Sequence, residues 1–127
     1  MRSPLRGDTS AAPGLAPPLT ARRSYDNNYT GWVTLLGDAL GGDDVSPVAS
    51  PARVTNFAGF APAYIEVGDL DIFRDESIAY ALGLAKAGVP IELHVHPGAP
   101  HGFERFVPDA GVARRAMTDR VRAVATI

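Results

Sequence analysis

The stretch that decides the fold covers residues 63–96 and reads AYIEVGDLDIFRDESIAYALGLAKAGVPIELHVH. It opens with a short apolar run typical of a strand, residues 63–67, and Gly68 ends that run. Over residues 75–87, apolar side chains recur at i, i+3, i+4 and i+7, which predicts one face of a helix. Residues 91–96 then alternate as a second strand. The stretch therefore predicts a strand–helix–strand unit.

Helix boundaries support this interpretation. Asp75 and Glu76 suit the positive end of the first helix, and Gly88 and Pro90 stop it. A last helix is predicted to start near Asp109 as N-cap. It is expected to run through Val112, Ala116, Val121 and Val124.

The fold class predicted from these elements is α/β. Strand, helix, strand and helix joined by short connections form a unit of a parallel sheet. Two strands do not complete such a sheet, because each strand is normally paired and sandwiched between helices. We expect an incomplete parallel sheet at one end of a larger domain. The helix sides at Ile78/Leu82 and Val121/Val124 should then lack partners, which makes the isolated chain marginally stable and sticky.

The first part of the chain differs from the rest. Residues 1–24 are rich in proline, glycine and arginine and poor in large apolar side chains, so we expect a mobile arm. Residues 25–127 are predicted to form the ordered portion. That portion begins with a short helix within residues 25–40 and a long loop over residues 43–62.

Composition excludes several classes of protein. The chain has 127 residues, a formal net charge of −2 and no cysteine. It therefore has no disulfide framework or thiol nucleophile, and no electrostatic reason to bind nucleic acid. Interrupted apolar runs predict no membrane span and no secretory signal, so a cytoplasmic location is expected.

Two loops carry the residues suited to chemistry. Functional groups in open α/β sheets follow the carboxyl ends of the strands, where Asp71 and His101 occur. Parallel strands bring these loops to one edge, so an aspartate could orient and stabilise an imidazole there. A lone loop histidine is more often simply solvated, and acids at a helix start are more often caps. His94 and His96 share a strand face and admit a metal interpretation, although no acid at ligand spacing accompanies them.

Several blocks resemble one family in the same order. They are AYIEVGDLD (63–71), RDE (74–76), AGVPIELHV (87–95) and HGF (101–103), preceded by Trp32, LLG (35–37), VSP (45–47) and PAR (51–53). Together they resemble the C-terminal part of α/β-hydrolase-fold esterases of the hormone-sensitive-lipase type. The resemblance implies a catalytic aspartate at Asp71, a catalytic histidine at His101, small ester substrates and no cofactor. It also implies that the last strand, Ile91–His96, is a sheet edge available for homodimer pairing.

The sequence lacks the family's nucleophile. The nucleophile elbow reads G-x-S-x-G, with glycine two residues before and two residues after the serine. No serine here has glycine at either of these positions; the serines are Ser3, Ser10, Ser24, Ser46, Ser50 and Ser77. Ser10 gives only a faint match to that segment. The glycine-rich oxyanion loop is also missing, since Gly41-Gly42 follows leucine and not histidine. We expect the chain alone to be inactive as an esterase.

Three hypotheses follow from different classes of protein. The first is the Asp/His-bearing part of a serine ester hydrolase, whose nucleophile lies upstream or on another chain. The second is a non-catalytic remnant that acts as an interaction module through its edge strand. The third is a metal-dependent or binding protein that uses His94, His96 and His101.

Overall fold

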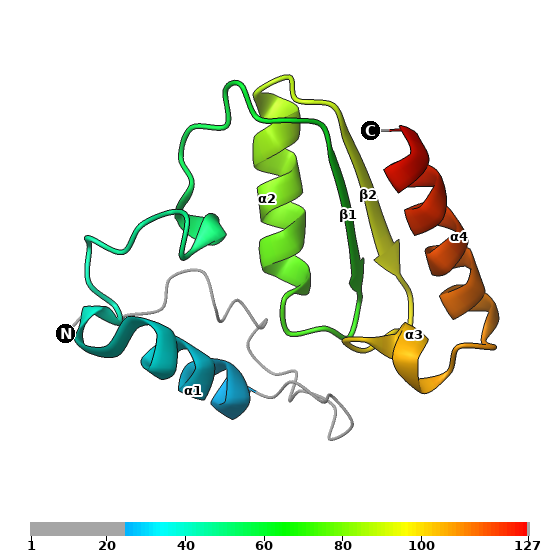
Figure 1. Ribbon diagram of the computed structural model, residues 1–127, viewed down its shortest axis with the longest axis horizontal. Coiled ribbons are helices and arrows are strands. Elements are labelled where there is room, and N and C mark those ends of the chain that lie inside the picture. Colours follow the sequence, from blue (N-terminus) through cyan, green and yellow to red (C-terminus); the bar gives the residue numbers. More distant parts are fainter. Residues whose placement is uncertain (1–24, 127) are drawn as a thin grey trace.

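The computed structural model describes residues 25–126 (Figure 1). In chain order these form α1 (Tyr25–Leu36), the 3-10 turns η1 (Gly37–Ala39) and η2 (Pro51–Arg53), β1 (Ala63–Gly68), α2 (Arg74–Lys86), β2 (Ile91–His96), α3 (Phe103–Phe106) and α4 (Gly111–Thr126). The arm predicted for residues 1–24 lies outside the described residues. Within the part that is described, no helix is long and apolar enough to cross a membrane.

The predicted strand–helix–strand unit is confirmed. β1 and β2 pair in parallel, with Ala63 opposite Ile91 and Gly68 opposite His96. α2 connects them and begins and ends within one residue of its predicted limits. The sheet has two strands in the described residues, as expected of an incomplete parallel sheet.

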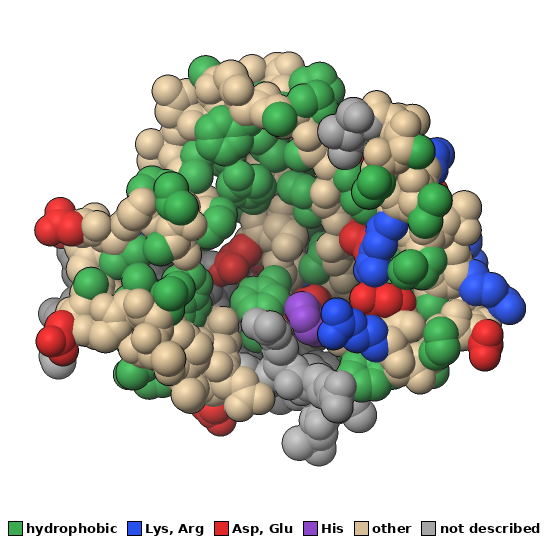
Figure 2. All heavy atoms as spheres, viewed as in Figure 1, with side chains coloured by type: hydrophobic (Ala, Val, Ile, Leu, Met, Phe, Trp, Pro, Cys, Tyr) green, Lys and Arg blue, Asp and Glu red, His purple; other side chains and the backbone are tan. Residues whose placement is uncertain are grey.

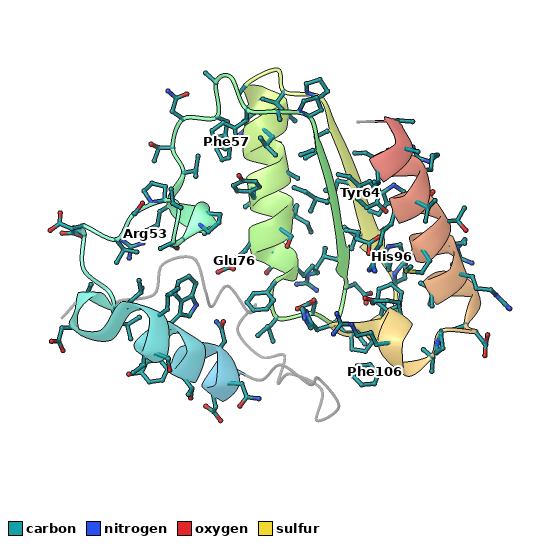
Figure 3. All side chains as sticks on the ribbon, viewed as in Figure 1. Arg53, Phe57, Tyr64, Glu76, His96 and Phe106 are labelled. Atoms are coloured by element: carbon teal, nitrogen blue, oxygen red, sulfur yellow. The ribbon has the colours of Figure 1, made fainter. Side chains whose placement is uncertain are left out.

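The sheet has an apolar face and an ionic face. Side chains alternate between faces along a strand, and paired residues of parallel strands share a face. The residues at odd positions are apolar on both strands and face α2; they are Ala63, Ile65, Val67, Ile91, Leu93 and Val95. The even positions carry Tyr64, Glu66, Glu92, His94 and His96 and face α4. Figure 1 shows the two helices on opposite sides of the strands, and Figure 3 shows Tyr64 and His96 on the α4 side.

α2 is only partly covered. Ala81 and Leu84 are buried against the sheet, whereas Ile78 and Leu82 are 36% and 52% exposed. On another flank, the ring of Phe57 packs edge-on against Tyr80, with centroids 5.2 Å apart. Figure 2 shows hydrophobic side chains gathered around a hollow in the middle of this view. The exposed Ile78/Leu82 side agrees with the prediction that it lacks a partner.

α4 buries small residues. Ala113 and Ala116 form a core cluster with Ala99 and Phe103, while Val121 and Val124 are exposed, as expected. The predicted N-cap is wrong by one residue. The helix begins at Gly111, and the carbonyl of Ala110, not of Asp109, accepts the first helical hydrogen bond, from the Arg114 amide. The short helix α3 was not predicted, because four residues give no periodic pattern.

Candidate active site

The carboxyl ends of both strands meet at one edge, and backbone hydrogen bonds tie their loops together. The Asp69 amide donates to the His96 carbonyl at 3.0 Å, and the Leu70 amide donates to the Ala99 carbonyl at 3.2 Å. The Asp69 carboxylate in turn accepts the Gly98 amide at 2.7 Å. These contacts fix the loop after β1 against the loop after β2.

Gly68 makes this close approach possible. A Cβ at this position would lie 1.9 Å from the Ala99 carbonyl oxygen and 2.7 Å from its carbon. Both are backbone atoms, so a side chain could not be accommodated by a rotamer change. The residue that ends β1 must therefore be glycine for the two loops to touch.

Asp71 and His101 lie together at this edge. His101 Nδ1 is 2.8 Å from Asp71 Oδ2, and the other carboxylate oxygen, Oδ1, accepts the Phe73 amide at 3.0 Å. The Asp71 side chain is 7% exposed and that of His101 is 37% exposed. The Phe73 ring also meets the imidazole edge-on, with centroids 5.8 Å apart. The carboxylate is thus held from one side by the backbone and presents its free oxygen to the imidazole.

This arrangement suits proton transfer. When Nδ1–H donates to the carboxylate, Nε2 carries the lone pair and can take a proton from a neighbouring hydroxyl. The buried carboxylate then stabilises the imidazolium that forms. Because His101 is partly exposed, its imidazole is open to a second group. Gly102, at φ 68°, follows His101 and turns the chain into α3 through the left-handed conformation.

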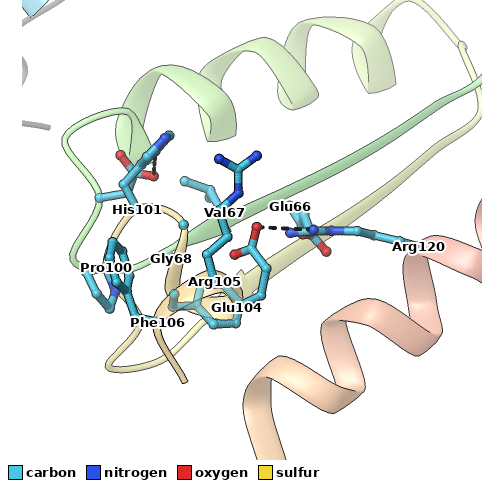
Figure 4. A pocket seen from close by; sticks show the side chains of 12 residues that line it. Glu66, Val67, Gly68, Pro100, His101, Glu104, Arg105, Phe106 and Arg120 are labelled. Carbon is cyan, nitrogen blue, oxygen red and sulfur yellow. Dashed lines mark hydrogen bonds and ion pairs between the residues drawn. The ribbon is translucent and has the colours of Figure 1, made fainter. Parts of the chain in front are cut away.

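A pocket of about 310 Å³ lies beside the imidazole. Asp71 and His101 line it together with residues of β1, α3 and α4 (Figure 4). Besides Asp71 and His101, the pocket is lined by the charged side chains of Glu66, Glu104, Arg105 and Arg120. Glu66, Glu104 and Arg120 are joined by hydrogen bonds, and we call these three the ionic cluster. Arg120 donates to both carboxylates, from Nη1 to Glu104 Oε1 at 3.2 Å and from Nε to Glu66 Oε1.

Sequence reasoning missed the ionic cluster. Glu66, Glu104 and Arg120 come from three elements that are distant in sequence, so no local motif contains them. A signal did exist, because the alternation along β1 puts Glu66 on a face that would ordinarily be apolar in a parallel sheet. An acid at such a position needs a buried cation, and α4 is rich in arginine.

The other two histidines have partners other than Asp71 and His101, the two residues that we call the dyad. His94 Nε2 is 2.6 Å from Glu92 Oε1, and its Nδ1 is 3.8 Å from Asp119 on α4. His96 is buried against the Phe103 ring, with centroids 5.2 Å apart. Across residues 25–126, no group of three or more histidine and acidic side chains is placed to hold a metal ion. The metal interpretation therefore gains no ligand set from the described part of the chain.

The predicted absence of a nucleophile concerns serines in two regions. Ser3, Ser10 and Ser24 lie outside the described residues. Ser46, in the loop before η2, accepts the Val48 amide at 3.2 Å and so closes a local turn. Ser77 lies on α2.

The fold and the dyad together define a class: an α/β protein with an acid–imidazole pair at the carboxyl edge of a parallel sheet. The comparisons with known proteins agree with it. The pattern of the family described as "alpha/beta hydrolase fold" matches residues 13–105, and the chain belongs to that family. Lipase 2 of Moraxella sp. (strain TA144) is 55% identical over 103 residues, covering 68% of this chain and 24% of that lipase.

Solved structures agree. Esterase LipW from Mycobacterium marinum has a TM-score of 0.72 at 33% identity, covering 81% of this chain and 32% of that one. Brefeldin A esterase, a bacterial homologue of human hormone-sensitive lipase, has a TM-score of 0.53 at 34% identity, covering 64% of this chain and 22% of that one. The fold and the resemblance to esterases of the hormone-sensitive-lipase type are thereby confirmed. The chain spans about a quarter of the length of Lipase 2.

Proposed function

We propose that this chain supplies the aspartate and histidine of a serine-type carboxylic ester hydrolase. The observation that carries the proposal is the 2.8 Å contact between His101 Nδ1 and Asp71 Oδ2 at the carboxyl edge of the sheet. Membership of the α/β hydrolase family and similarity to lipases and esterases support the reaction class. No cofactor is part of this chemistry.

The two side chains divide the work. His101 Nε2 takes the proton of a serine hydroxyl as its oxygen attacks the ester carbonyl, and then gives that proton to the departing alcohol. Asp71 keeps the imidazole in the required tautomer and stabilises its charged form. The serine precedes both residues in hydrolases of this fold. Because no serine here has the glycines of the elbow, we propose that the nucleophile and oxyanion donors come from polypeptide outside these 127 residues, so the chain alone is inactive.

The test is best made on the protein in its own cells. A C-terminal affinity tag on the chromosomal gene allows purification, an intact-mass measurement and an assay of p-nitrophenyl butyrate hydrolysis. We expect hydrolysis that is abolished in His101→Ala and reduced by about 10³ to 10⁴ in Asp71→Asn, the effect of losing the orienting acid. His94→Gln is the matched control, since it alters a histidine of the same sheet without touching the dyad.

Two results would contradict the proposal. One is hydrolysis that survives in His101→Ala at the level of the control. The other is a tagged protein with a mass near that of the 13.4 kDa chain that hydrolyses no ester. The second result would favour the non-catalytic remnant over the hydrolase.

The interaction module remains the second candidate. Within the described residues β2 pairs on one side only, with β1, and its Leu93 and Val95 are each 38% exposed. We propose that Ile91–His96 pairs with the same strand of a second copy of this chain. We also propose that the protein functions in the cytoplasm. Light scattering tests this pairing: Leu93→Lys should shift a dimer to monomer because a charged side chain blunts an exposed edge.

A further inference from the structure

Arg120 connects two carboxylates that belong to different elements. Its Nη1 donates to Glu104 on α3 at 3.2 Å, and its Nε and Nη2 are directed at Glu66 on β1. The two acids are 15% and 11% exposed, whereas the arginine side chain is 34% exposed. The guanidinium therefore reaches inward from α4 and satisfies two largely buried acids.

Each of those acids adjoins one half of the dyad. Glu66 lies two residues before Gly68, where the chain leaves β1 for the loop that carries Asp71. Glu104 lies in α3, which begins two residues after His101. One side chain of α4 thus ties the strand before Asp71 to the helix after His101, and the pocket lies between them (Figure 4).

The charges of Arg120, Glu66 and Glu104 strengthen the link between β1 and α3. Burial alone would lower the pKa of Arg120, but its hydrogen bonds to the two carboxylates outweigh burial and raise the pKa. Glu66 also accepts the Tyr64 hydroxyl at 2.8 Å, which adds no positive charge. The Nε2 of His96, buried and without a hydrogen-bond partner, is 3.7 Å from Glu66. Without Arg120, the two largely buried acids would lose the cation that they share, and only the charge of Arg105 near Glu104 would remain.

α3 is also held in place by apolar packing. Phe103 is buried in the core cluster with Ala99, Ala113 and Ala116. Apolar packing fixes how deeply this residue sits, but it has little directional preference. The hydrogen bond that Arg120 Nη1 donates to the Glu104 carboxylate is directional, so it restricts rotation of α3 about the phenylalanine. His101 lies only two residues before α3, so a change in the orientation of α3 would be passed to the backbone of His101.

We propose that Arg120 is a positioning residue, which holds α3 and β1 at the separation that keeps His101 Nδ1 in hydrogen-bond contact with Asp71. Its catalytic meaning rests on the proposed function, whereas its effect on the Asp71–His101 contact does not. Arg120 itself touches neither residue of the dyad. It acts through Glu66 and Glu104.

The experiment is proton NMR of the full 127-residue chain. An imidazole N–H bonded to a carboxylate gives a far-downfield signal, which Asp71→Asn should remove and thereby assign to His101. We expect Arg120→Gln to weaken that signal and to quicken the exchange of its proton with water roughly tenfold or more, as for a loosened charge-assisted hydrogen bond. Arg120→Lys should restore the signal only in part, because an ammonium lacks the planar fork that reaches two carboxylates.

Two further variants keep the test decisive. Glu104→Ala removes the acceptor on the α3 side of the cluster but leaves the bond between Arg120 and Glu66, so it should quicken exchange even if Arg120→Gln does not fold. Arg122→Gln is the matched control, since Arg122 lies on the same helix and pairs with Glu92 and Asp119. It should leave the His101 signal unchanged.

Three results would overturn the proposal. They are a wild-type chain with no such downfield signal, a folded Glu104→Ala variant with wild-type exchange, and equal quickening in Arg122→Gln. The last would mean that the signal follows the general docking of α4. None of these readouts needs a nucleophile or an ester. Failure of the esterase test with a responsive N–H signal would therefore refute the hydrolase function and leave the positioning role intact.

Discussion

Replacement of Gly68 by alanine should separate the two loops of the site. The new Cβ would lie 1.9 Å from the Ala99 carbonyl oxygen, and real Cβ contacts essentially never fall below 3.0 Å. The Ala99 loop must therefore retreat by about 1 Å. Overpacking of this kind typically costs about 1–3 kcal/mol of stability. The bond from the Leu70 amide to the same carbonyl is 3.2 Å long, so the retreat breaks it and adds about 1 kcal/mol.

The expected loss is thus about 2–4 kcal/mol in the free energy of unfolding. That is a large share of the roughly 5–15 kcal/mol typical of a domain. Urea denaturation followed by far-ultraviolet circular dichroism measures it, and the midpoint should fall by about 1–3 M. Gly31→Ala is the matched control, because a Cβ there meets nothing within 4 Å and the residue lies inside α1. It should be neutral or stabilising by up to about 1 kcal/mol.

A Gly68→Ala variant with the midpoint of the wild-type chain would refute this reasoning. It would mean that the two loops are not held in contact at this point. The downfield His101 signal offers an independent check, since separation of the loops should also weaken the contact between His101 and Asp71.

Three further predictions concern other residues. Phe103→Ala should cost about 3–5 kcal/mol in unfolding free energy by leaving a cavity, whereas Phe103→Leu should cost less in the same urea titration. Burial tends to raise the pKa of Glu104, but a backbone amide and Arg120 outweigh it and lower the pKa. The stabilisation from Glu104 is therefore complete above about pH 4.3, the usual pKa of a glutamate, and is lost as the pH falls through the lower pKa of the folded chain. Between about pH 5 and about pH 3, the free energy of unfolding should therefore change less in Glu104→Gln than in the wild-type chain. Leu82→Lys should reduce dye binding to exposed apolar surface and improve solubility, and unchanged dye binding would show that this side is already covered.

The sequence predicted the elements with strong local signals. The strands were visible as short apolar or alternating runs, and the helix between them had a clear period closed by Gly88. The meeting of Asp71 and His101 followed from one topological rule, because parallel strands bring their carboxyl ends to the same edge. Their catalytic roles stay a prediction.

The remainder depended on packing that no local window contains. The limits of α3 and the start of α4 at Gly111 depend on how Phe103 enters the core. The partners of Arg120 lie 16 and 54 positions away in the chain. The strand alternation indicated that Glu66 needed a cation, but α4 has several arginines and only their place on the helix selects one.

The contrast between the two faces of the sheet has a mechanical consequence. On the α2 side, apolar surfaces could slide past one another with little preference for register. On the α4 side, Arg120 pairs with an acid of β1 and Arg122 pairs with an acid of β2. These two ion pairs fix the position of the helix along its own axis. A slip of one turn, about 5.4 Å, would mispair both arginines at once. Stretching the chain from its C-terminal end should therefore release α4 in a single abrupt step, while α2 would yield gradually.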